Sequence, residues 1–195
     1  MSEAVSRSGE PSRSSEPWYP VETERLILRA YRPEDFGDVH SYACDPEVTR
    51  MLPWGPNDAE ASCTFLGQRI EEQTRWPRPE CTLAIELKAS GRLIGGISLR
   101  IRDPANRTAD IGYLLHREYW GRGYMPEAGR AILKVAFEVL GLHRVWATCD
   151  VRNAGSWRVM EKLGMRREAA CLRDVLQKGE WRDSYHYAIV EDEWR

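Results

Sequence analysis

Two glycines, Gly121 and Gly123, stand one residue apart directly ahead of a long helical pattern, in "EYWGRGYMPEAGRAILKVAFEVLG" (residues 118–141). The first N–H groups of a helix have no intrahelical partner, and the helix dipole favours negative charge there. Glycine also lets an anion approach the backbone without meeting a Cβ atom. The stretch therefore favours a phosphate-binding turn, although an ordinary strand-to-helix turn without a ligand has the same pattern.

The two best-known phosphate loops do not fit this stretch. A Walker loop needs Gly-Lys followed by Ser or Thr, which is absent, and a dinucleotide fingerprint needs a third glycine where Pro126 stands. The glycine spacing alone therefore leaves the ligand open.

The elements expected around the turn alternate between strands and helices. A strand is expected in residues 107–116, and a helix follows the glycines and ends at Gly141. The helix has one apolar face, formed by Ala128, Ala131, Ile132, Val135, Ala136, Val139 and Leu140. Other strands are expected in residues 23–31, 81–103 (two strands), 142–151 and 166–190 (two strands), and other helices in 32–48, 57–75 and 153–164. This order indicates a single α/β or α+β domain.

Composition narrows the possible partners. The 195 residues carry a net charge of −2, which gives no general attraction for nucleic acid or anionic membranes, so neither partner is expected. Five cysteines without a CxxC pair predict neither a metal site nor a disulfide framework, and they fit a cytoplasmic location. Residues 1–17 are rich in Ser, Pro, Arg and Glu, which predicts a disordered leader before a domain spanning 18–195.

Several motifs together resemble one known family. "ADIGYLLHREYWGRGYMPEA" followed by "HRVWATCDVRNAGSWRVMEKLGMRREA" resembles the GNAT superfamily of acyl-CoA-dependent N-acetyltransferases. "TERLILRAYRPEDF" and "GEWRDSYHYAIV" look more narrowly like its Rim-type branch, whose known members acetylate ribosomal-protein N-termini. The resemblance covers residues 22–190. It implies a mixed, mostly antiparallel sheet, splayed at its centre and flanked by helices, with acetyl-CoA as co-substrate and no metal.

The resemblance also assigns cofactor-binding residues. The family's pyrophosphate signature falls on Trp120, Gly121, Arg122, Gly123, Tyr124 and Met125. Gly123 matches the central glycine of the signature, whereas Trp120 replaces a polar residue and Met125 a small one. Arg122 either adds a cationic contact or is simply solvated. The backbone of Leu114 and Leu115 is expected to bind pantetheine and polarise the thioester carbonyl, and Asn153 and Ser156 begin the following cofactor-binding helix.

The acid and the base of the reaction are assigned by the same resemblance. Many members use a tyrosine as acid at the position of Met160, which cannot donate a proton, whereas the Rim-type branch uses a serine at the position of Ser156. The alternative role of Ser156 is helix capping. Asp110 and Asp174 are the leading candidates for the base, and His116 is the third.

The acceptor is a primary amine in this interpretation. A protein N-terminal α-amine is the first choice; the alternatives are a small amine (polyamine, amino acid or aminoglycoside) and a non-catalytic CoA-binding module. Trp54 is expected either to wall the acceptor pocket or to cover the core beneath a loop. A homodimer is compatible with this interpretation.

Overall fold

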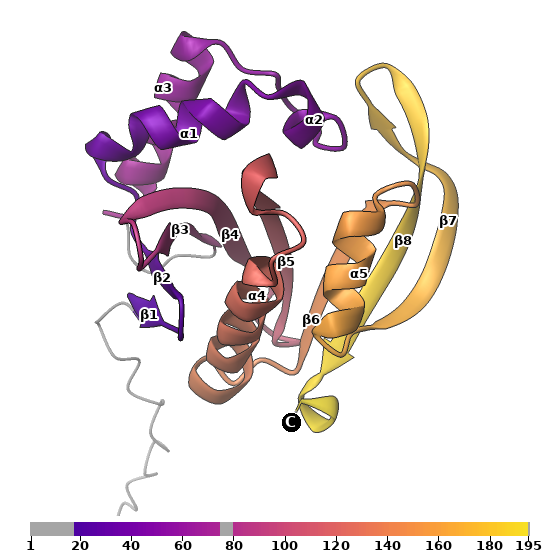
Figure 1. The fold of residues 1–195 in the computed structure, drawn as a ribbon. Coiled ribbons are helices and arrows are strands. Elements are labelled where there is room, and N and C mark those ends of the chain that lie inside the picture. The colour runs from indigo at the N-terminus through magenta and orange to yellow at the C-terminus, as the bar shows by residue number, and fades with distance from the viewer. Residues whose placement is uncertain (1–17, 75–79, 195) are drawn as a thin grey trace, which may run out of the picture.

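The computed structural model describes residues 18–74 and 80–194 and contains one mixed eight-stranded sheet (Figure 1). The leader predicted for residues 1–17 lies outside the described residues. The strand order is β1-β2-β3-β4-β5-β6-β8-β7, and β5–β6 is the one parallel pair among the described strands. The strands are β1 (Val21–Glu22), β2 (Leu26–Arg29), β3 (Glu80–Leu87), β4 (Arg92–Asp103), β5 (Thr108–Leu115), β6 (Arg144–Asp150), β7 (Arg166–Gln177) and β8 (Glu180–Val190). The predicted mixed, mostly antiparallel sheet is confirmed.

Helices cover both faces of this sheet. They are η1 (Pro33–Asp35), α1 (Phe36–Ala43), α2 (Pro46–Thr49), α3 (Ala59–Glu72), η2 (Arg117–Tyr119), α4 (Tyr124–Lys134), η3 (Val135–Val139), α5 (Ala154–Lys162) and η4 (Glu191–Glu193). Adjacent residues of β3 belong to different cores: Leu83 packs in the cluster that contains α4, and Ala84 in the cluster that contains α1. Because successive strand residues point to opposite faces, α4 and α1 lie on opposite sides of the sheet. None of the described helices is long and apolar enough to cross a membrane.

The sheet opens between its two central strands. β5 pairs with β6 over only three residue pairs, from Thr108↔Arg144 to Asp110↔Trp146. On its other side, β5 stays paired with β4 as far as Gly95↔Leu115. Residues 111–115 of β5 therefore have no strand partner on the β6 side, and this is the splayed centre that the resemblance implied.

The apolar helix is correct in its position and wrong at one residue of its predicted face. α4 ends at Lys134 and continues as a π-helical turn, η3, in which the Leu140 N–H donates to the Val135 carbonyl at 2.9 Å. A π turn holds an extra residue and therefore shifts the register of the residues after it. Val139 is 62% exposed instead of buried, while Gly141 ends the segment with a φ of +61°.

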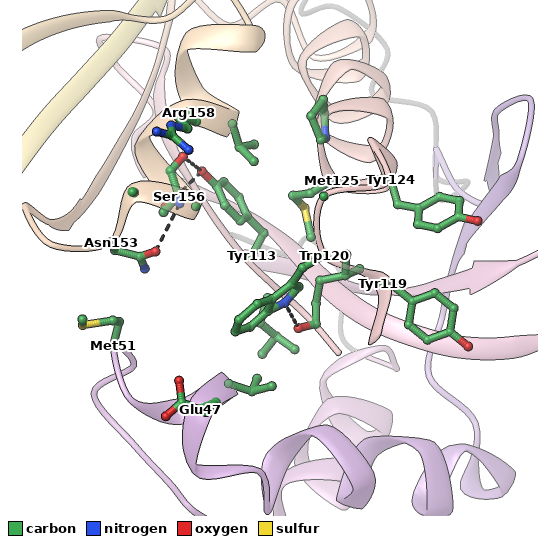
Figure 2. Close-up of a pocket in the computed structure, with 18 of the residues that line it drawn as sticks. Glu47, Met51, Tyr113, Tyr119, Trp120, Tyr124, Met125, Asn153, Ser156 and Arg158 are labelled. Atoms are coloured by element: carbon green, nitrogen blue, oxygen red, sulfur yellow. Dashed lines mark hydrogen bonds between the residues drawn. The ribbon is translucent and has the colours of Figure 1, made fainter. Parts of the chain in front are cut away.

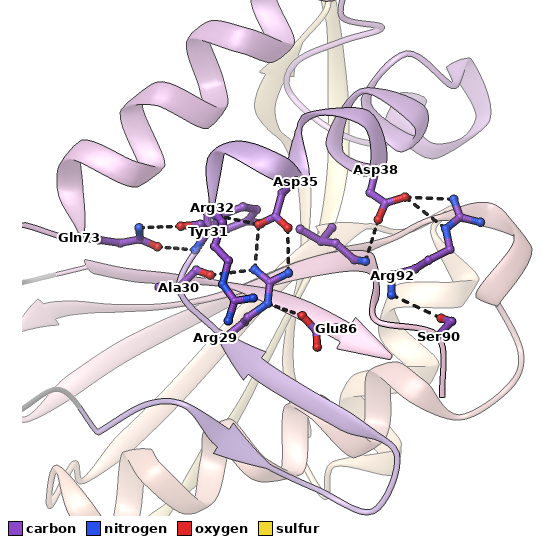
Figure 3. Close-up of polar contacts among 11 residues, drawn as sticks. Arg29, Ala30, Tyr31, Arg32, Asp35, Asp38, Gln73, Glu86, Ser90 and Arg92 are labelled. Atoms are coloured by element: carbon purple, nitrogen blue, oxygen red, sulfur yellow. Dashed lines mark hydrogen bonds and ion pairs between the residues drawn. The ribbon is translucent and has the colours of Figure 1, made fainter. Parts of the chain in front are cut away.

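A buried ion cluster attaches α1 to the sheet (Figure 3). Arg29 of β2 donates two hydrogen bonds of 2.8 Å to Asp35 of η1, and its Nε donates to Glu86 of β3. Burial alone would lower the pKa of Arg29, but the hydrogen bonds and charges of the two carboxylates outweigh it and raise that pKa. The guanidinium therefore stays charged and fixes the start of α1 relative to β2 and β3.

Candidate active site

A cleft of about 530 Å³ lies where the sheet opens (Figure 2). Its walls come from the end of β5, the glycine turn with the start of α4, the start of α5, and α2 with the residues after it. The lining residues are Glu47, Val48, Arg50, Met51, Leu52, Tyr113, Leu114, Leu115, Tyr119, Trp120, Gly121, Gly123, Tyr124, Met125, Pro126, Arg152, Asn153, Ala154, Gly155, Ser156, Arg158, Val159 and Lys162. Nearly all the residues predicted to bind the cofactor therefore line one cleft.

Both glycines of the turn have left-handed backbone conformations. Gly121 has a φ of +73°, and Gly123, the N-cap of α4, has a φ of +82°. Any other L-residue would be strained at these angles, so the turn itself requires glycine. The turn leads into α4 at the cleft wall, where the first N–H groups of the helix have no intrahelical partner.

The residues that depart from the pyrophosphate signature have structural roles in the turn. The Trp120 indole N–H donates to the Leu115 carbonyl at 2.7 Å, which ties the turn to the end of β5. Arg122 does not line the cleft: its guanidinium lies 5.8 Å from the Tyr119 ring centre, and its carbonyl accepts a hydrogen bond from Arg25. The cationic contact considered for Arg122 is therefore not supported.

The open edge of β5 presents backbone to the cleft. The Leu115 side chain is buried in the core that contains α4, and Leu114 packs against the core that contains α1. Both residues line the cleft. Their predicted contribution, through backbone rather than side chain, fits this arrangement.

Ser156 lies on the α5 wall, and its hydroxyl is not the helix cap. The cap is Asn153, whose Oδ1 accepts the Ser156 N–H at 3.2 Å. The Ser156 Oγ lies 3.2 Å from the Tyr113 hydroxyl, which also donates to the Ser156 carbonyl at 3.0 Å (Figure 2). The structure therefore separates the two roles considered for this serine and leaves its hydroxyl at the cleft.

Tyr113 is a cleft residue that the sequence analysis missed. Burial raises the pKa of its phenol, and the hydrogen bond with Ser156 offsets only part of this effect, so the phenol stays protonated. A tyrosine within a strand usually belongs to the core, so its residue type gave no sign of this position. The one feature of the sequence that could have indicated this position is that Tyr113 lies two residues before Leu115, in the strand whose end was expected to bind pantetheine.

Asp110 is not brought to the cleft. It lies directly opposite Arg100 in the β4–β5 ladder, is 3% exposed, and binds the guanidinium groups of Arg100 and Arg102. Cross-strand neighbours on one face of a sheet meet, and the two guanidinium partners compensate the charge of this buried carboxylate. The structure does not support its prediction as the base.

Asp174 and His116, the other candidate bases, also lie outside the residues that line the cleft. Asp174 accepts a hydrogen bond from the Ser184 hydroxyl at 2.6 Å and contacts His186 Nε2 at 3.2 Å. Burial would raise the pKa of Asp174, but these hydrogen bonds outweigh it and lower that pKa, which weakens the carboxylate as a base. The His116 Nδ1 accepts the Glu118 N–H at 3.2 Å as the N-cap of η2.

One group of metal-ligating side chains occurs among the described residues. Cys171, Asp174 and His186 offer ligand atoms within 4.8 Å of one another on the β7–β8 hairpin. Asp174 is already hydrogen-bonded within this group, and none of the three residues lines the cleft.

Trp54 lies away from the cleft. Its ring stacks on Phe65 of α3, with the ring centres 6.4 Å apart, and it packs against the core that contains α1. It lines a separate hollow together with residues of α3. The position of Trp54 fits the predicted role of covering the core, and it does not fit the role of a wall of this cleft.

The charges of the cleft are unequal. Glu47 is the one carboxylate among its described lining residues, whereas Arg50, Arg152, Arg158 and Lys162 are cationic. Asp45 caps α2 by accepting the Glu47 N–H at 2.9 Å and binds Arg117 at 3.1 Å, which fixes α2 against η2. The sequence analysis expected one helix through residues 32–48, whereas α1 ends at Ala43 and α2 begins separately at Pro46 after the Asp45 cap. The sequence gave no sign that Glu47 reaches a site.

Cys149 lies beside Ser156 and should react slowly with alkylating reagents. Burial raises the pKa of its thiol to about 11, and the Ser156 hydroxyl lowers it only in part. At pH 8 the thiolate fraction should be roughly 100-fold smaller than that of an unperturbed thiol. In an iodoacetamide time course followed by peptide mass spectrometry, we expect the exposed Cys44 and Cys63 to react first. In urea, where the protein is unfolded, the three cysteines should react at equal rates, which is the control. Labelling of Cys149 in the folded protein as fast as that of Cys44 and Cys63 would contradict the expectation.

Comparisons with known proteins agree with this geometry. Residues 25–166 match the family model of the acetyltransferase (GNAT) domain. The uncharacterized N-acetyltransferase YnaD of Bacillus subtilis is 33% identical over 175 residues, which cover 89% of this chain and 98% of YnaD. A GNAT-family acetyltransferase structure from Bacillus anthracis superposes with a TM-score of 0.79 at 32% identity, covering 88% of this chain and 98% of that one.

A Rim-type enzyme is among the solved structures that share the fold. RimL, a ribosomal α-N-protein acetyltransferase solved with coenzyme A joined by a disulfide to one of its own cysteines, shares the fold. Its TM-score is 0.76 at 20% identity, with 88% of this chain and 97% of RimL covered. The family resemblance drawn from the motifs is confirmed. The chain belongs to the GNAT family of acetyltransferases and is an acetyl-CoA-dependent N-acetyltransferase that acts on an amine.

Proposed function

We propose that this enzyme acetylates the α-amine of a protein N-terminus, with Ser156 as the general acid. The observation that carries the proposal is the Ser156 hydroxyl on the cleft wall, free of the capping role and facing a cleft that includes the open edge of β5. Acyl transfer to an amine needs a neutral amine, a donor for the oxyanion and a proton for the leaving thiolate. A main-chain N–H of β5 and the Ser156 hydroxyl can meet the last two needs within this cleft, and the amine reacts in its neutral form after it loses a proton to solvent.

In the proposed reaction, the amine nitrogen attacks the thioester carbon and the carbonyl oxygen becomes an oxyanion. A main-chain N–H of Leu114 or Leu115 donates to that oxygen. The carbon–sulfur bond then breaks, the sulfur takes the Ser156 hydroxyl proton, and the amine nitrogen releases one proton to solvent water. Ser156 regains a proton through solvent, so the products are the acetylated amine and the coenzyme A thiol.

Tyr113 is a positioning residue in this proposal. Its phenol stays protonated and lies within hydrogen-bonding distance of the Ser156 Oγ, so it can hold the serine hydroxyl in one orientation. The pyrophosphate binds to backbone N–H groups from Gly121 to Met125, at the N-terminus of α4.

Charge supports a peptide over a polyamine as the acceptor. Two relatives differ here: YdaF of Bacillus subtilis, provisionally named a ribosomal N-acetyltransferase, is 36% identical over 104 residues, and the spermidine N(1)-acetyltransferase of Escherichia coli is 23% identical over 168. A polyamine carries several positive charges into a cleft lined by four cationic side chains and one carboxylate. A peptide N-terminus carries one positive charge, so the cationic side chains of the cleft repel it less.

An acceptor panel read by release of free coenzyme A tests this proposal. The panel contains peptides with a free α-amine and no other amine, spermidine, single amino acids and an aminoglycoside. We expect kcat/KM for the best peptide to exceed that for spermidine by about tenfold or more, because each unfavourable charge pair costs on the order of 1 kcal/mol. A preference for spermidine would support the small-amine alternative. Binding of acetyl-CoA without turnover of any acceptor would support a non-catalytic CoA-binding module.

A further inference from the structure

We infer that Glu47 is the site that binds the ammonium group of the acceptor. This inference rests on the proposed function, because it assigns the acceptor side of the same cleft. None of the three carboxylate or imidazole candidates from the sequence lines the cleft, so the acceptor cation must find its counter-charge elsewhere. Glu47 is the one carboxylate among the described residues of the cleft wall.

The position of Glu47 suits this role. It belongs to α2, whose place is fixed by the Asp45 cap, by the ion pair of Asp45 with Arg117 at 3.1 Å, and by a hydrogen bond of 2.9 Å from Lys178 to the Thr49 carbonyl. Figure 2 shows the Glu47 carboxylate across the cleft from Ser156, with Trp120 to one side. An acceptor that enters from the α2 side therefore meets Glu47 on the way to the open edge of β5.

The carboxylate is available to a ligand. Among the described residues its one ion pair is with Arg50 at 3.5 Å, three residues along the chain, and the two side chains are 53% and 59% exposed. Exposed pairs of this kind contribute between nothing and about 1 kcal/mol, so an arriving ammonium can replace Arg50 at little cost. By contrast, Arg152, another cation of the cleft, is held by two hydrogen bonds to Asp150.

The surroundings of Glu47 also select the acceptor. Val48, Met51 and Leu52 line the cleft beside it and give an apolar wall next to one negative charge. An ammonium entering such a wall needs a counter-charge, because an unpaired cation is costly to desolvate. The arrangement fits an acceptor with a single ammonium beside an apolar segment, as at a peptide N-terminus with an apolar first side chain.

The test is Glu47→Gln, which keeps the shape of the side chain and removes its charge. With the best peptide of the acceptor panel, we expect the acceptor KM to rise about fivefold, the upper end of the scale for an ion pair with a half-exposed carboxylate, while the KM for acetyl-CoA stays the same. Arg50→Gln should act in the opposite direction and lower the acceptor KM, because it frees Glu47. Added salt should raise the acceptor KM of the wild type and have little effect on that of Glu47→Gln.

Glu34→Gln is the matched control. Glu34 is also an exposed glutamate in the first turn of a short helix, but it does not line the cleft, so its variant should keep both KM values. An unchanged acceptor KM in Glu47→Gln, in an enzyme that acetylates peptides and depends on Ser156, would overturn this inference alone. A wild type that acetylates no member of the panel would overturn it together with the proposed function. A lower melting temperature with unchanged KM values would assign Glu47 a structural role only.

Discussion

Ser156→Ala should lower kcat by roughly one to three orders of magnitude and leave the affinity for acetyl-CoA unchanged. This decrease in kcat is the usual one for losing a positioned general acid. The affinity should be kept because the proposed site for the phosphates is the glycine turn, which is another element. Turnover with the best acceptor and calorimetric titration with acetyl-CoA measure the two quantities on one protein.

Asn153→Ala is the control that separates catalysis from capping. Asn153 accepts the Ser156 N–H at the start of α5, so its loss should cost about 1 kcal/mol of the free energy of unfolding. Ser156→Ala keeps that hydrogen bond, since the donor is the backbone, and its melting temperature should change little. A Ser156→Ala enzyme that is less stable but fully active would end the assignment of this serine as the acid.

Tyr113→Phe extends this reasoning. If the phenol only orients the Ser156 hydroxyl, the variant should lose less of kcat than Ser156→Ala does, and the double variant should lose no more than Ser156→Ala alone. Coupled residues are non-additive in this way, whereas independent contributions would multiply.

Local signals explain what the sequence predicted well. Asn153 caps its helix, and Gly141 ends its segment in a left-handed conformation, because each role depends on a few neighbouring residues. The cofactor half of the cleft was predictable for the same reason: residues 114–125 form one continuous stretch. Met160, which was predicted to be unable to donate a proton, is buried in the core, as expected for an apolar side chain.

The acceptor half depends on how distant segments pack, and here sequence reasoning failed. Glu47 reaches the cleft because α2 is fixed against η2, about 70 residues along the chain, and no local pattern contains that information. Asp110 looked available because the pairing register that places Arg100 opposite it is not visible in a single strand. The exposed Val139 has a similar cause, since a π turn changes the register without a sequence signal of its own.

The second large effect concerns stability. Arg29→Ala should cost about 3–5 kcal/mol of the free energy of unfolding, because it leaves two carboxylates without their shared guanidinium in a nearly water-free place (Figure 3). Asp35 and Arg29 have side chains only 7% and 6% exposed, and Glu86 is 15% exposed. Arg29→Lys, which keeps the charge but loses the two-pronged geometry, should cost less than Arg29→Ala, and it keeps the test informative if the alanine variant does not fold.

Arg92→Ala is the matched control in the same region. Arg92 binds Asp38 of α1 at 3.1 Å, but its side chain is 47% exposed, and Asp38 keeps a backbone partner in the Leu93 N–H. Its loss should cost at most about 1 kcal/mol. Urea unfolding of the three variants measures the difference, and equal costs for Arg29→Ala and Arg92→Ala would contradict the assignment. Because the Arg29 cluster attaches α1 to β2 and β3, and α2 follows α1 directly, mild destabilisation there should raise the acceptor KM before the KM for acetyl-CoA, whose proposed phosphate site is at the start of α4.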